Sequence, residues 1–489
     1  MKILEQFKAA RRVSVPLIAI KTPDMASTIR TVGETLNGKA PVVCWDVIGG
    51  LRALNDKGQT ALADALPDGG PGDVANPAEA MRVALAFPEG TVLFLMNAQR
   101  HLDNAATAQA AWNLRDPFKS NRRTLVMLAP DIILPPELAR DVLILDEPYP
   151  TPDELANIII EAHEAAQLPN PKDSVTSKAV DAVAGLAAFP AEQSVAMSLT
   201  KAGMDLEGLW ERKRSLIEQT PGLSVWRGGE TFADVAGLAN IKTFLSRLIG
   251  GKDPFRAVAF LDELEKMAGG GESSHETTQA QQEAFLSWMQ NTRALGIILT
   301  GVAGAGKSLT AKAAGGQAGV PVVMMSLSAL RGSLVGQTEQ NTRTAFKAID
   351  AIAQGRVLLI ATCNRMGALT PEIRSRFRLG IFFYDFPDET EAAALWKMFR
   401  AKFKVPEKDA QPEAKNWVGR EIESCCELSY LLGIPLKEAA GYIVPVAQSA
   451  AAEVEAVRAF ASGRFIGASK PGVYTNQKAA PSGRKFEIA

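Results

Sequence analysis

A glycine-rich stretch, GVAGAGKS at residues 301–308, has the residue types and the spacing of a phosphate-binding loop. It follows an apolar run and precedes a helix-forming segment, and phosphate binding requires this strand–turn–helix setting. Glycines let backbone N–H groups curl around phosphates, and the start of the helix adds its positive end. We expect Lys307 to reach the β- and γ-phosphates and Ser308 to bind Mg²⁺. The expected nucleotide contacts are Gly301, Gly304, Ala305, Gly306, Lys307, Ser308 and Leu309.

An acidic pair ends a second apolar run, VAFLDE at residues 258–263. A magnesium nucleotide site needs a carboxylate to hold the ion and, for hydrolysis, a base to polarise water. Asp262 is the candidate metal ligand, and Glu263 is the candidate base. The alternative is an ordinary strand that ends in acids. We assign that structural role to Asp146 and Glu147 in the similar run DVLILDE, because nothing near them in the sequence binds phosphate.

The acidic run precedes the phosphate loop in the chain, whereas proteins that use both elements nearly always have the reverse order. In a doubly wound sheet the connections lie at two edges, so rejoining loops at one edge changes the chain order without moving the strands. We therefore expect strand 257–262 to lie near the loop strand, with strand 357–364 between them. The site would keep its geometry, and only the order of its segments along the chain would change.

Polar residues beyond the middle strand complete the candidate site. Asn364 ends VLLIATCN and is placed to contact the γ-phosphate, although a simple turn former is the alternative. Arg374, Arg376 and Arg378 follow in EIRSRFRLG. An arginine from a neighbouring subunit supplies transition-state charge in such sites, and the alternative is a solvated or carboxylate-paired face. Arg420 opens a later helix and could bend back to the same phosphates.

Composition excludes several classes of protein. The 489 residues include 53 basic and 54 acidic side chains, and a formal net charge of −1 gives no attraction to nucleic acid or anionic lipid. The four cysteines lack C-x-x-C spacing, which indicates reduced core residues. The early run VPLIAI is too short for a signal peptide, and no window approaches the ~20 apolar residues of a membrane span. We therefore expect a cytoplasmic protein with no membrane contact.

Alternation of short apolar runs with helix-length segments predicts parallel sheets covered by helices. Residues 125–155 resemble residues 357–391, which indicates two related modules, but no phosphate loop follows the first strand of the first module. The expected domains are a degenerate α/β module without a phosphate loop (1–150), a helical lid or linker (151–227), the α/β nucleotide domain (228–387), a helical lid (388–465) and a flexible tail (466–489).

With these residues in place, the second module resembles an AAA+ ATPase. LTAKAAGGQAGVPVVMMSLSALRGSLVGQTEQNTRTAF matches the family's stretch after the phosphate loop, and ATCNRMGALTPEIRSRFR matches its sensor-1 and arginine-finger region. GREIESCCEL matches the start of its sensor-2 helix. DVAGLANIKTFL resembles the family's adenine-side segment, and this adds Asp234 and Gly237 to the expected nucleotide contacts. The whole chain resembles the AAA ATPases known as plastid and cyanobacterial open reading frames.

The resemblance implies a P-loop AAA+ fold, which is a doubly wound parallel sheet with a C-terminal helical lid. It also implies that this domain is circularly permuted, because the acidic segment comes before the phosphate loop. It also implies ATP and Mg²⁺ as cofactors and a ring or helical homo-oligomer, such as a hexamer. Expected catalytic residues are Glu263, Lys307, Asn364, Arg374 and Arg376. At the pore-loop position, Leu334 replaces the aromatic residue of unfolding motors, so threading of a client chain is in doubt.

The expected function is Mg²⁺-dependent ATP hydrolysis coupled to remodelling of a protein partner. One alternative is a scaffold that assembles on ATP and hydrolyses it slowly. A motor that handles nucleic acid is a further alternative, which the charge balance disfavours.

Overall fold

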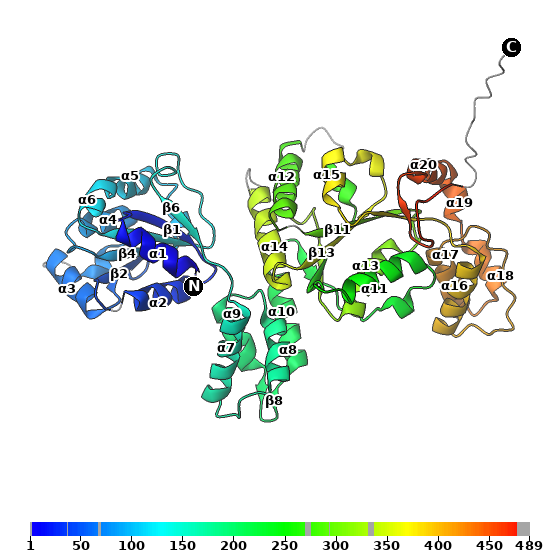
Figure 1. Ribbon diagram of the computed structural model, residues 1–489, viewed down its shortest axis with the longest axis horizontal. Coiled ribbons are helices and arrows are strands. Elements are labelled where there is room, and N and C mark those ends of the chain that lie inside the picture. The colour runs from blue at the N-terminus through cyan, green and yellow to red at the C-terminus, as the bar shows by residue number, and fades with distance from the viewer. Residues whose placement is uncertain are drawn as a thin grey trace, which may run out of the picture. The chain divides into compact units, whose positions relative to one another are not determined.

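The computed structural model describes residues 2–36, 38–66, 70–268, 275–292, 294–330 and 337–476. It divides into two compact units, which we describe separately (Figure 1). The first contains the residues up to Val180 together with Leu186–Met204, and the second contains Asp181–Gly185 and the residues from Asp205 onward. Within the described ranges, no helix is both long and apolar enough to cross a membrane.

The first unit contains a six-stranded sheet. Its strands are β1 (Leu17–Lys21), β2 (Val42–Asp46), β3 (Gly50–Ala53), β4 (Val92–Leu95), β5 (Thr124–Ala129) and β6 (Leu143–Asp146). Their order across the sheet is β3-β2-β4-β5-β1-β6, and β2 and β3 form the antiparallel pair. The parallel strands are those that the apolar runs predict, whereas β3 was not predicted because its four residues, GLRA, form no apolar run.

Helices cover both faces of this sheet. They are α1 (Lys2–Arg12), α2 (Met25–Thr35), α3 (Asp56–Ala65), α4 (Pro77–Ala84), α5 (Ala105–Asn113) and α6 (Arg115–Ser120). Buried side chains of α1 and α2 share a core with one face of the sheet, and those of α3 to α6 share a core with the other.

A helical region follows the first sheet in the chain, as the sequence predicts. Its helices are α7 (Pro152–Ala165), α8 (Asp173–Val183), α9 (Ala188–Met197) and α10 (Leu206–Glu218). A capping box opens α7, because Thr151 and Glu154 exchange side-chain-to-backbone hydrogen bonds. A two-residue hairpin, β7 (Leu199–Thr200) with β8 (Gly203–Met204), precedes α10.

The second unit contains a seven-stranded sheet that is parallel except at one edge. Its strands are β9 (Leu223–Val225), β10 (Ala257–Leu261), β11 (Leu295–Gly301), β12 (Val322–Met325), β13 (Val357–Cys363), β14 (Ile381–Tyr384) and β15 (Ile466–Gly467). Their order is β15-β14-β11-β13-β10-β12-β9, so β13 lies between β11 and β10, as expected. Because these three strands are parallel, their carboxyl ends meet at one edge of the sheet, although β10 comes first in the chain.

Helices again cover both faces of this second sheet. They are α11 (Ala239–Ile249), α12 (His275–Thr292), α13 (Lys307–Ala318), α14 (Gln337–Ala353) and the short α15 (Pro371–Arg376). Figure 1 shows α11 and α13 on one face and α12 and α14 on the other, and the two sets of buried side chains agree. The predicted doubly wound α/β fold is therefore confirmed.

A helical lid follows the second sheet. Its helices are α16 (Glu389–Lys402), α17 (Gly419–Leu432), α18 (Leu436–Ala439), α19 (Val446–Ser449) and α20 (Ala451–Ala461). Asp388 and Glu391 form the capping box that the sequence predicts at the start of α16. Cys425 and Cys426 lie in the core of the lid and are fully buried, which confirms the prediction that they are packed core residues.

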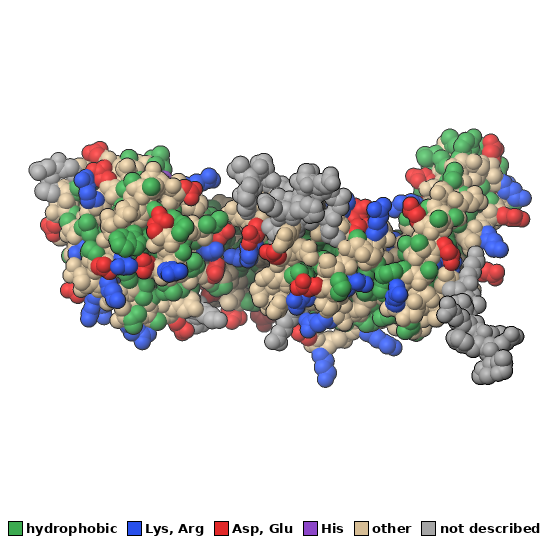
Figure 2. All heavy atoms as spheres, turned by 90° about the horizontal axis from the view of Figure 1, so that it is seen from above, with side chains coloured by type: hydrophobic (Ala, Val, Ile, Leu, Met, Phe, Trp, Pro, Cys, Tyr) green, Lys and Arg blue, Asp and Glu red, His purple; other side chains and the backbone are tan. Residues whose placement is uncertain are grey.

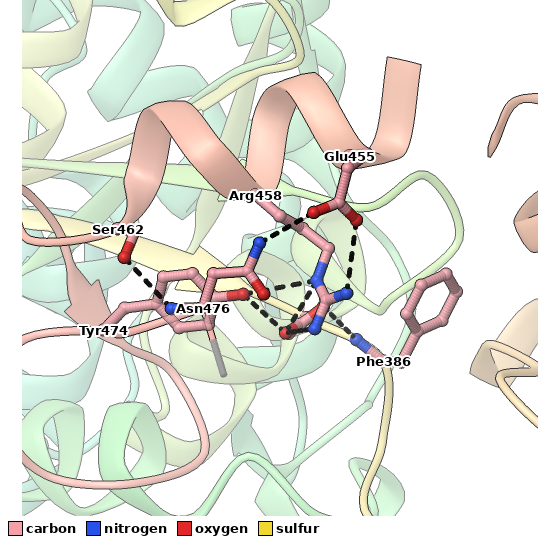
Figure 3. Close-up of polar contacts among 7 residues, drawn as sticks. Phe386, Glu455, Arg458, Ser462, Tyr474 and Asn476 are labelled. Carbon is pink, nitrogen blue, oxygen red and sulfur yellow. Dashed lines mark hydrogen bonds and ion pairs between the residues drawn. The ribbon is translucent and has the colours of Figure 1, made fainter. Parts of the chain in front are cut away.

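The prediction of a flexible tail from residue 466 is wrong for residues 466–476. Strand β15 pairs with β14, and the Tyr474 ring packs against the Phe383 ring with centroids 4.3 Å apart and planes tilted by 44°. Asp385 accepts a hydrogen bond from the Tyr474 hydroxyl at 2.7 Å and pairs with Arg458 of α20. Figure 3 shows Tyr474, Asn476 and Arg458 among the polar contacts of this segment. Side chains from distant parts of the chain supply these partners, and composition alone does not reveal them. Residues 477–489 lie outside the described residues.

Candidate nucleotide site

The phosphate loop joins β11 to α13 and is built against neighbouring backbone. Gly301 has a φ of 132°, and a Cβ at this position would lie 2.1 Å from the carbonyl oxygen of Tyr384. Gly304 has a φ of 79°, and a Cβ there would lie 2.9 Å from Cγ2 of Val418. Both positions therefore require glycine, because a side chain would meet strained backbone and occupied space.

Lys307 is the first residue of α13 and is only 8% exposed. Its ammonium group donates hydrogen bonds to the carbonyl oxygens of Gly301 at 2.9 Å and Val302 at 3.0 Å. Burial lowers the pKa of Lys307 to about 8, against the opposing influence of the nearby Glu265 and Asp262 carboxylates. Lys307 is therefore a buried cation at the start of a helix that follows a glycine-rich turn, and such a turn can bind phosphates through its backbone N–H groups.

Ser308 and Leu309 occupy the first turn of α13, directly after Lys307, and Ala305 lies in the loop before it. All three are half-buried. Gly306 precedes the helix with a φ of 93°. The expected loop contacts thus form one continuous surface at the start of the helix, where the helix dipole favours an anion.

Asp262 directly follows β10, and its carboxylate accepts a hydrogen bond from the hydroxyl of Thr362 on β13. The structure brings this carboxylate to the same sheet edge as Lys307, near enough to influence its pKa. The strand order therefore allows two segments that are reversed in the chain to contribute to one site.

Glu263 is oriented differently from Asp262. Its backbone lies in the left-handed region, with a φ of 56°, and its carboxylate pairs with Lys266. The carboxylates that act on Lys307 are those of Glu265 and Asp262. Glu265 also accepts hydrogen bonds from the backbone N–H of Asn364, at 3.2 and 3.3 Å.

Asn364 directly follows β13 and is exposed. It therefore lies between the ends of β10 and β11, where the sequence places it. The backbone N–H of Asn364 is held by the Glu265 carboxylate.

The lid contributes Arg420, whose backbone N–H donates to the carbonyl oxygen of Gly304 at 3.3 Å. The guanidinium of Arg420 opposes protonation of Lys307, which places its positive charge near the phosphate loop. Two cations converge here, and an anion between them would relieve their repulsion. The start of α17 is thus in direct contact with the loop.

Leu238 brings the predicted adenine-side segment next to the phosphate loop. A Cβ on Gly306 would lie 3.6 Å from Cδ1 of Leu238. Gly237 has a φ of 68° and lies against Glu391, which accepts a hydrogen bond from the N–H of Leu238. The Asp234 carboxylate is used locally, as it accepts a hydrogen bond from the N–H of Thr231 at 2.8 Å.

The predicted arginine fingers lie on and after α15. The Nε atoms of Arg374 and Arg376 are buried and have no hydrogen-bond partner among the described residues, and Arg376 lies 3.8 Å from the Glu372 carboxylate. The structure brings neither residue into contact with Lys307. Arg378 follows the helix and is exposed. Leu334, at the predicted pore-loop position, lies outside the described residues.

The corresponding sheet edge of the first unit is filled by its own side chains. After β1, the hydroxyl of buried Thr28 donates to the carboxylate of Glu147 and lies 2.7 Å from the hydroxyl of Thr22. Asp24 caps the start of α2 by accepting a hydrogen bond from Ser27. Carboxylates of the protein itself therefore lie where a phosphate would meet this helix.

The donor set of the second unit fits a magnesium nucleotide. Mg²⁺ prefers oxygen ligands, usually one or two protein groups together with substrate phosphates. Asp262 and Ser308 offer a carboxylate and a hydroxyl at the same sheet edge as the loop.

Sequence reasoning missed two residues of this site, Glu265 and Thr362. Glu265 is visible only as a third acid in DELE, and the sequence does not show which of the acids turns towards the loop. Thr362 is a polar residue within the apolar strand VLLIATC, and that contrast is the signal that could have identified it.

Comparisons with known proteins identify two matching segments. Residues 3–147 match the SpoVK-like AAA ATPase N-terminal domain. Residues 297–353, which include the phosphate loop, match the ATPase family associated with various cellular activities, abbreviated AAA.

Relatives extend this similarity along the chain. The uncharacterized AAA domain-containing protein ycf46 of Guillardia theta is 22% identical over 454 residues, which cover 83% of this chain and 81% of that protein. The protein of the same name from Gracilaria tenuistipitata var. liui is 25% identical over 417 residues, 75% of this chain and 76% of that protein. Human ATPase family gene 2 protein homolog B is 30% identical over 159 residues, 30% of this chain and 20% of that protein.

Among solved structures, the FIGL-1 AAA domain in complex with ADP matches with a TM-score of 0.31 and 16% identity, covering 50% of this chain and 94% of that one. The similarity to AAA ATPases rests on these sequence matches, which include the phosphate loop. The chain thus carries a segment that matches the AAA ATPase family, and it is similar to the ycf46 proteins along most of its length.

Proposed function

We propose that the second unit hydrolyses ATP with Mg²⁺ and that its AAA module is circularly permuted. One observation carries the proposal: Asp262 and Lys307 share a sheet edge although β10 precedes β11 in the chain. Rejoining the loops at that edge accounts for the reversed order without moving any strand.

The proposed roles follow from the placement of each group. Lys307 binds the β- and γ-phosphates, while Ser308 and Asp262 bind Mg²⁺, which supplies charge neutralisation to the phosphates. Arg420 approaches the phosphates from the lid. Glu263 activates the attacking water once its carboxylate leaves Lys266, and the ion pair between them is exposed, so it is readily broken.

The remaining proposed contacts orient the bound nucleotide. Asn364 senses the γ-phosphate from the end of β13. The turn through Asp234 and Gly237 positions the adenine side, because it is linked to the lid by Glu391 and to the loop by Leu238. A lid that contacts both ends of the nucleotide can change position when the γ-phosphate is lost.

We further propose a ring or helical homo-oligomer, with six subunits as one form, that works in the cytoplasm on a protein client. Arg374 or Arg376 would act on the site of a neighbouring subunit, because their Nε atoms lack partners among the described residues and neither contacts Lys307 in its own chain. On the face in Figure 2, acidic and basic side chains are interspersed, which favours a protein client over nucleic acid.

Replacement of Glu263 by Gln tests the proposal. The variant should bind ATP as tightly as the wild type but lose at least 100-fold in the rate of hydrolysis, because only the base is removed. Lys266→Ala is the matched control: it removes the partner of Glu263 and should leave hydrolysis within a few-fold of the wild type. Unchanged hydrolysis by Glu263→Gln would contradict the assigned role.

The same variant separates a motor from an ATP-switched scaffold. Particle size is measured with and without ATP, and the cellular role is measured by complementation of a deletion strain. A remodelling motor assembles on ATP in the Glu263→Gln form but fails to complement. A scaffold assembles and still complements, and that result would overturn the remodelling role.

A further inference from the structure

We infer that Thr362 is a positioning residue that holds the Asp262 carboxylate and the Glu263 backbone in the geometry that Mg²⁺–ATP requires. The inference rests on the proposed roles of Asp262 and Glu263 in the second unit. None of the sequence patterns described above assigns Thr362 a role, and it does not itself contact the loop.

The hydroxyl of Thr362 makes two hydrogen bonds at once. It donates its proton to Oδ1 of Asp262, and it accepts a hydrogen bond from the backbone N–H of Glu263 at 2.9 Å. A hydroxyl has one proton and two lone pairs, so both bonds form without competition. Thr362 is 1% exposed, and its rotamer is restricted by branching at Cβ and by the surrounding core.

This pair of bonds fixes two features of the acidic turn. The carboxylate of Asp262, which is exposed, would otherwise sample several rotamers. The backbone of Glu263 has a φ of 56°, a conformation that a glutamate rarely adopts unless its surroundings impose it. Thr362 supplies the acceptor for the N–H group of that residue, so one side chain orients the proposed metal ligand and stabilises the turn that carries the proposed base.

A second bond joins the same two chain segments. Glu265 accepts hydrogen bonds from the N–H of Asn364, two residues after Thr362. The acidic turn and the end of β13 are therefore joined at two points, and the turn should stay attached when the Thr362 hydroxyl alone is removed. Loss of that hydroxyl should alter orientation without detaching the segment.

The adjacent strand offers a matched control. Thr300 is a fully buried threonine of β11, one residue before the phosphate loop, and its hydroxyl has no hydrogen-bond partner among the described residues. Thr300→Val and Thr362→Val make the same chemical change on neighbouring strands. Only the second removes a bond to the acidic turn.

The experiment compares Thr362→Val, Thr362→Ser and Thr300→Val in the full chain. The affinity for a fluorescent ATP analogue is measured in EDTA and across a Mg²⁺ titration, together with kcat and the unfolding temperature. Removing an outer partner of a metal ligand typically costs 10–100-fold in metal affinity. The Mg²⁺ concentration that gives half of the full increase in affinity for the ATP analogue should therefore be at least tenfold higher for Thr362→Val than for the wild type. In EDTA, the two proteins should bind the analogue with the same affinity.

Thr362→Ser retains the hydroxyl and should restore most of the Mg²⁺ response, and Thr300→Val should match the wild type. An unshifted Mg²⁺ titration for folded Thr362→Val would overturn the inference, as would an equal shift for Thr300→Val. Asp262→Asn distinguishes a failure of the positioning role of Thr362 from a failure of the proposed metal site. If Asp262→Asn abolishes the Mg²⁺ response but Thr362→Val does not, the positioning role alone fails. If Asp262→Asn has no effect, the proposed metal site itself is wrong.

Discussion

Gly304 lies where the phosphate loop meets the first turn of α17, and replacing it with alanine tests whether this contact controls nucleotide affinity. The new Cβ would lie 2.9 Å from Cγ2 of Val418 and 3.1 Å from Cβ of Arg420. These distances are too short for carbon atoms, so α17 or the loop must move. Since Arg420 is the second residue of this helix, its charge would move away from the phosphates.

The size of the effect follows from two contributions. Alanine at a φ of 79° costs about 1–2 kcal/mol because the left-handed region is unfavourable for residues with a Cβ. Overpacking against the lid adds about 1–3 kcal/mol. If half of the overpacking cost, about 0.5–1.5 kcal/mol, falls only on the nucleotide-bound form, ATP affinity decreases by roughly 2–13-fold.

Gly319 provides the control for the backbone contribution. It ends α13 with a φ of 66°, and a Cβ there would meet nothing within 4 Å. Gly319→Ala should lower the urea midpoint of unfolding by a similar backbone contribution and leave ATP affinity unchanged. Affinity is measured by calorimetric titration with an ATP analogue, and unfolding is followed in parallel by fluorescence. Equal ATP affinities for Gly304→Ala and Gly319→Ala would refute the argument that the lid contact controls nucleotide binding.

Three further predictions follow from the described contacts. Burial lowers the pKa of Lys213 from 10.5 to about 7, so between these pH values the folded protein binds fewer protons than the unfolded chain. The free energy of unfolding of the wild type should therefore rise, relative to that of Lys213→Met, as the pH increases from 7 to 10. Thermal unfolding of both proteins measures this difference. Asp385→Asn should lower stability by about 2 kcal/mol through loss of charged hydrogen bonds to Arg458 and Tyr474, whereas Tyr474→Phe should cost about 1 kcal/mol, as read from urea unfolding. Calorimetry should detect one ATP per chain and none after Lys307→Ala; a second site that survives this change would contradict the interpretation of the first unit.

The loop was predictable because all of its determinants are contiguous. Gly301, Gly304, Lys307 and Ser308 act through local backbone and the start of one helix, so their spacing alone defines the site. The place of Asp262 was predictable for a different reason. Parallel strands bring their carboxyl ends together whatever their order in the chain.

The directions in which the carboxylates of the acidic turn point were not predictable from the sequence. The backbone of Glu263, whose carboxylate pairs with Lys266, donates a hydrogen bond to the hydroxyl of Thr362, which lies 99 residues further along the chain. The order of residues 466–476 was missed for the same reason. Tyr474 is held by Asp385 across 89 residues, and a two-residue strand leaves no periodic signal.

A structure of the protein with Mg²⁺ and a non-hydrolysable ATP analogue tests the central claim most directly. We expect one metal ion beside the β- and γ-phosphates, about 2.1 Å from the Ser308 hydroxyl and bound by Asp262 directly or through one water. Lys307 should have exchanged its loop carbonyls for phosphate oxygens. Nucleotide bound at the loop with its metal beyond reach of Asp262 would contradict the claim that β10 and β11 build one site.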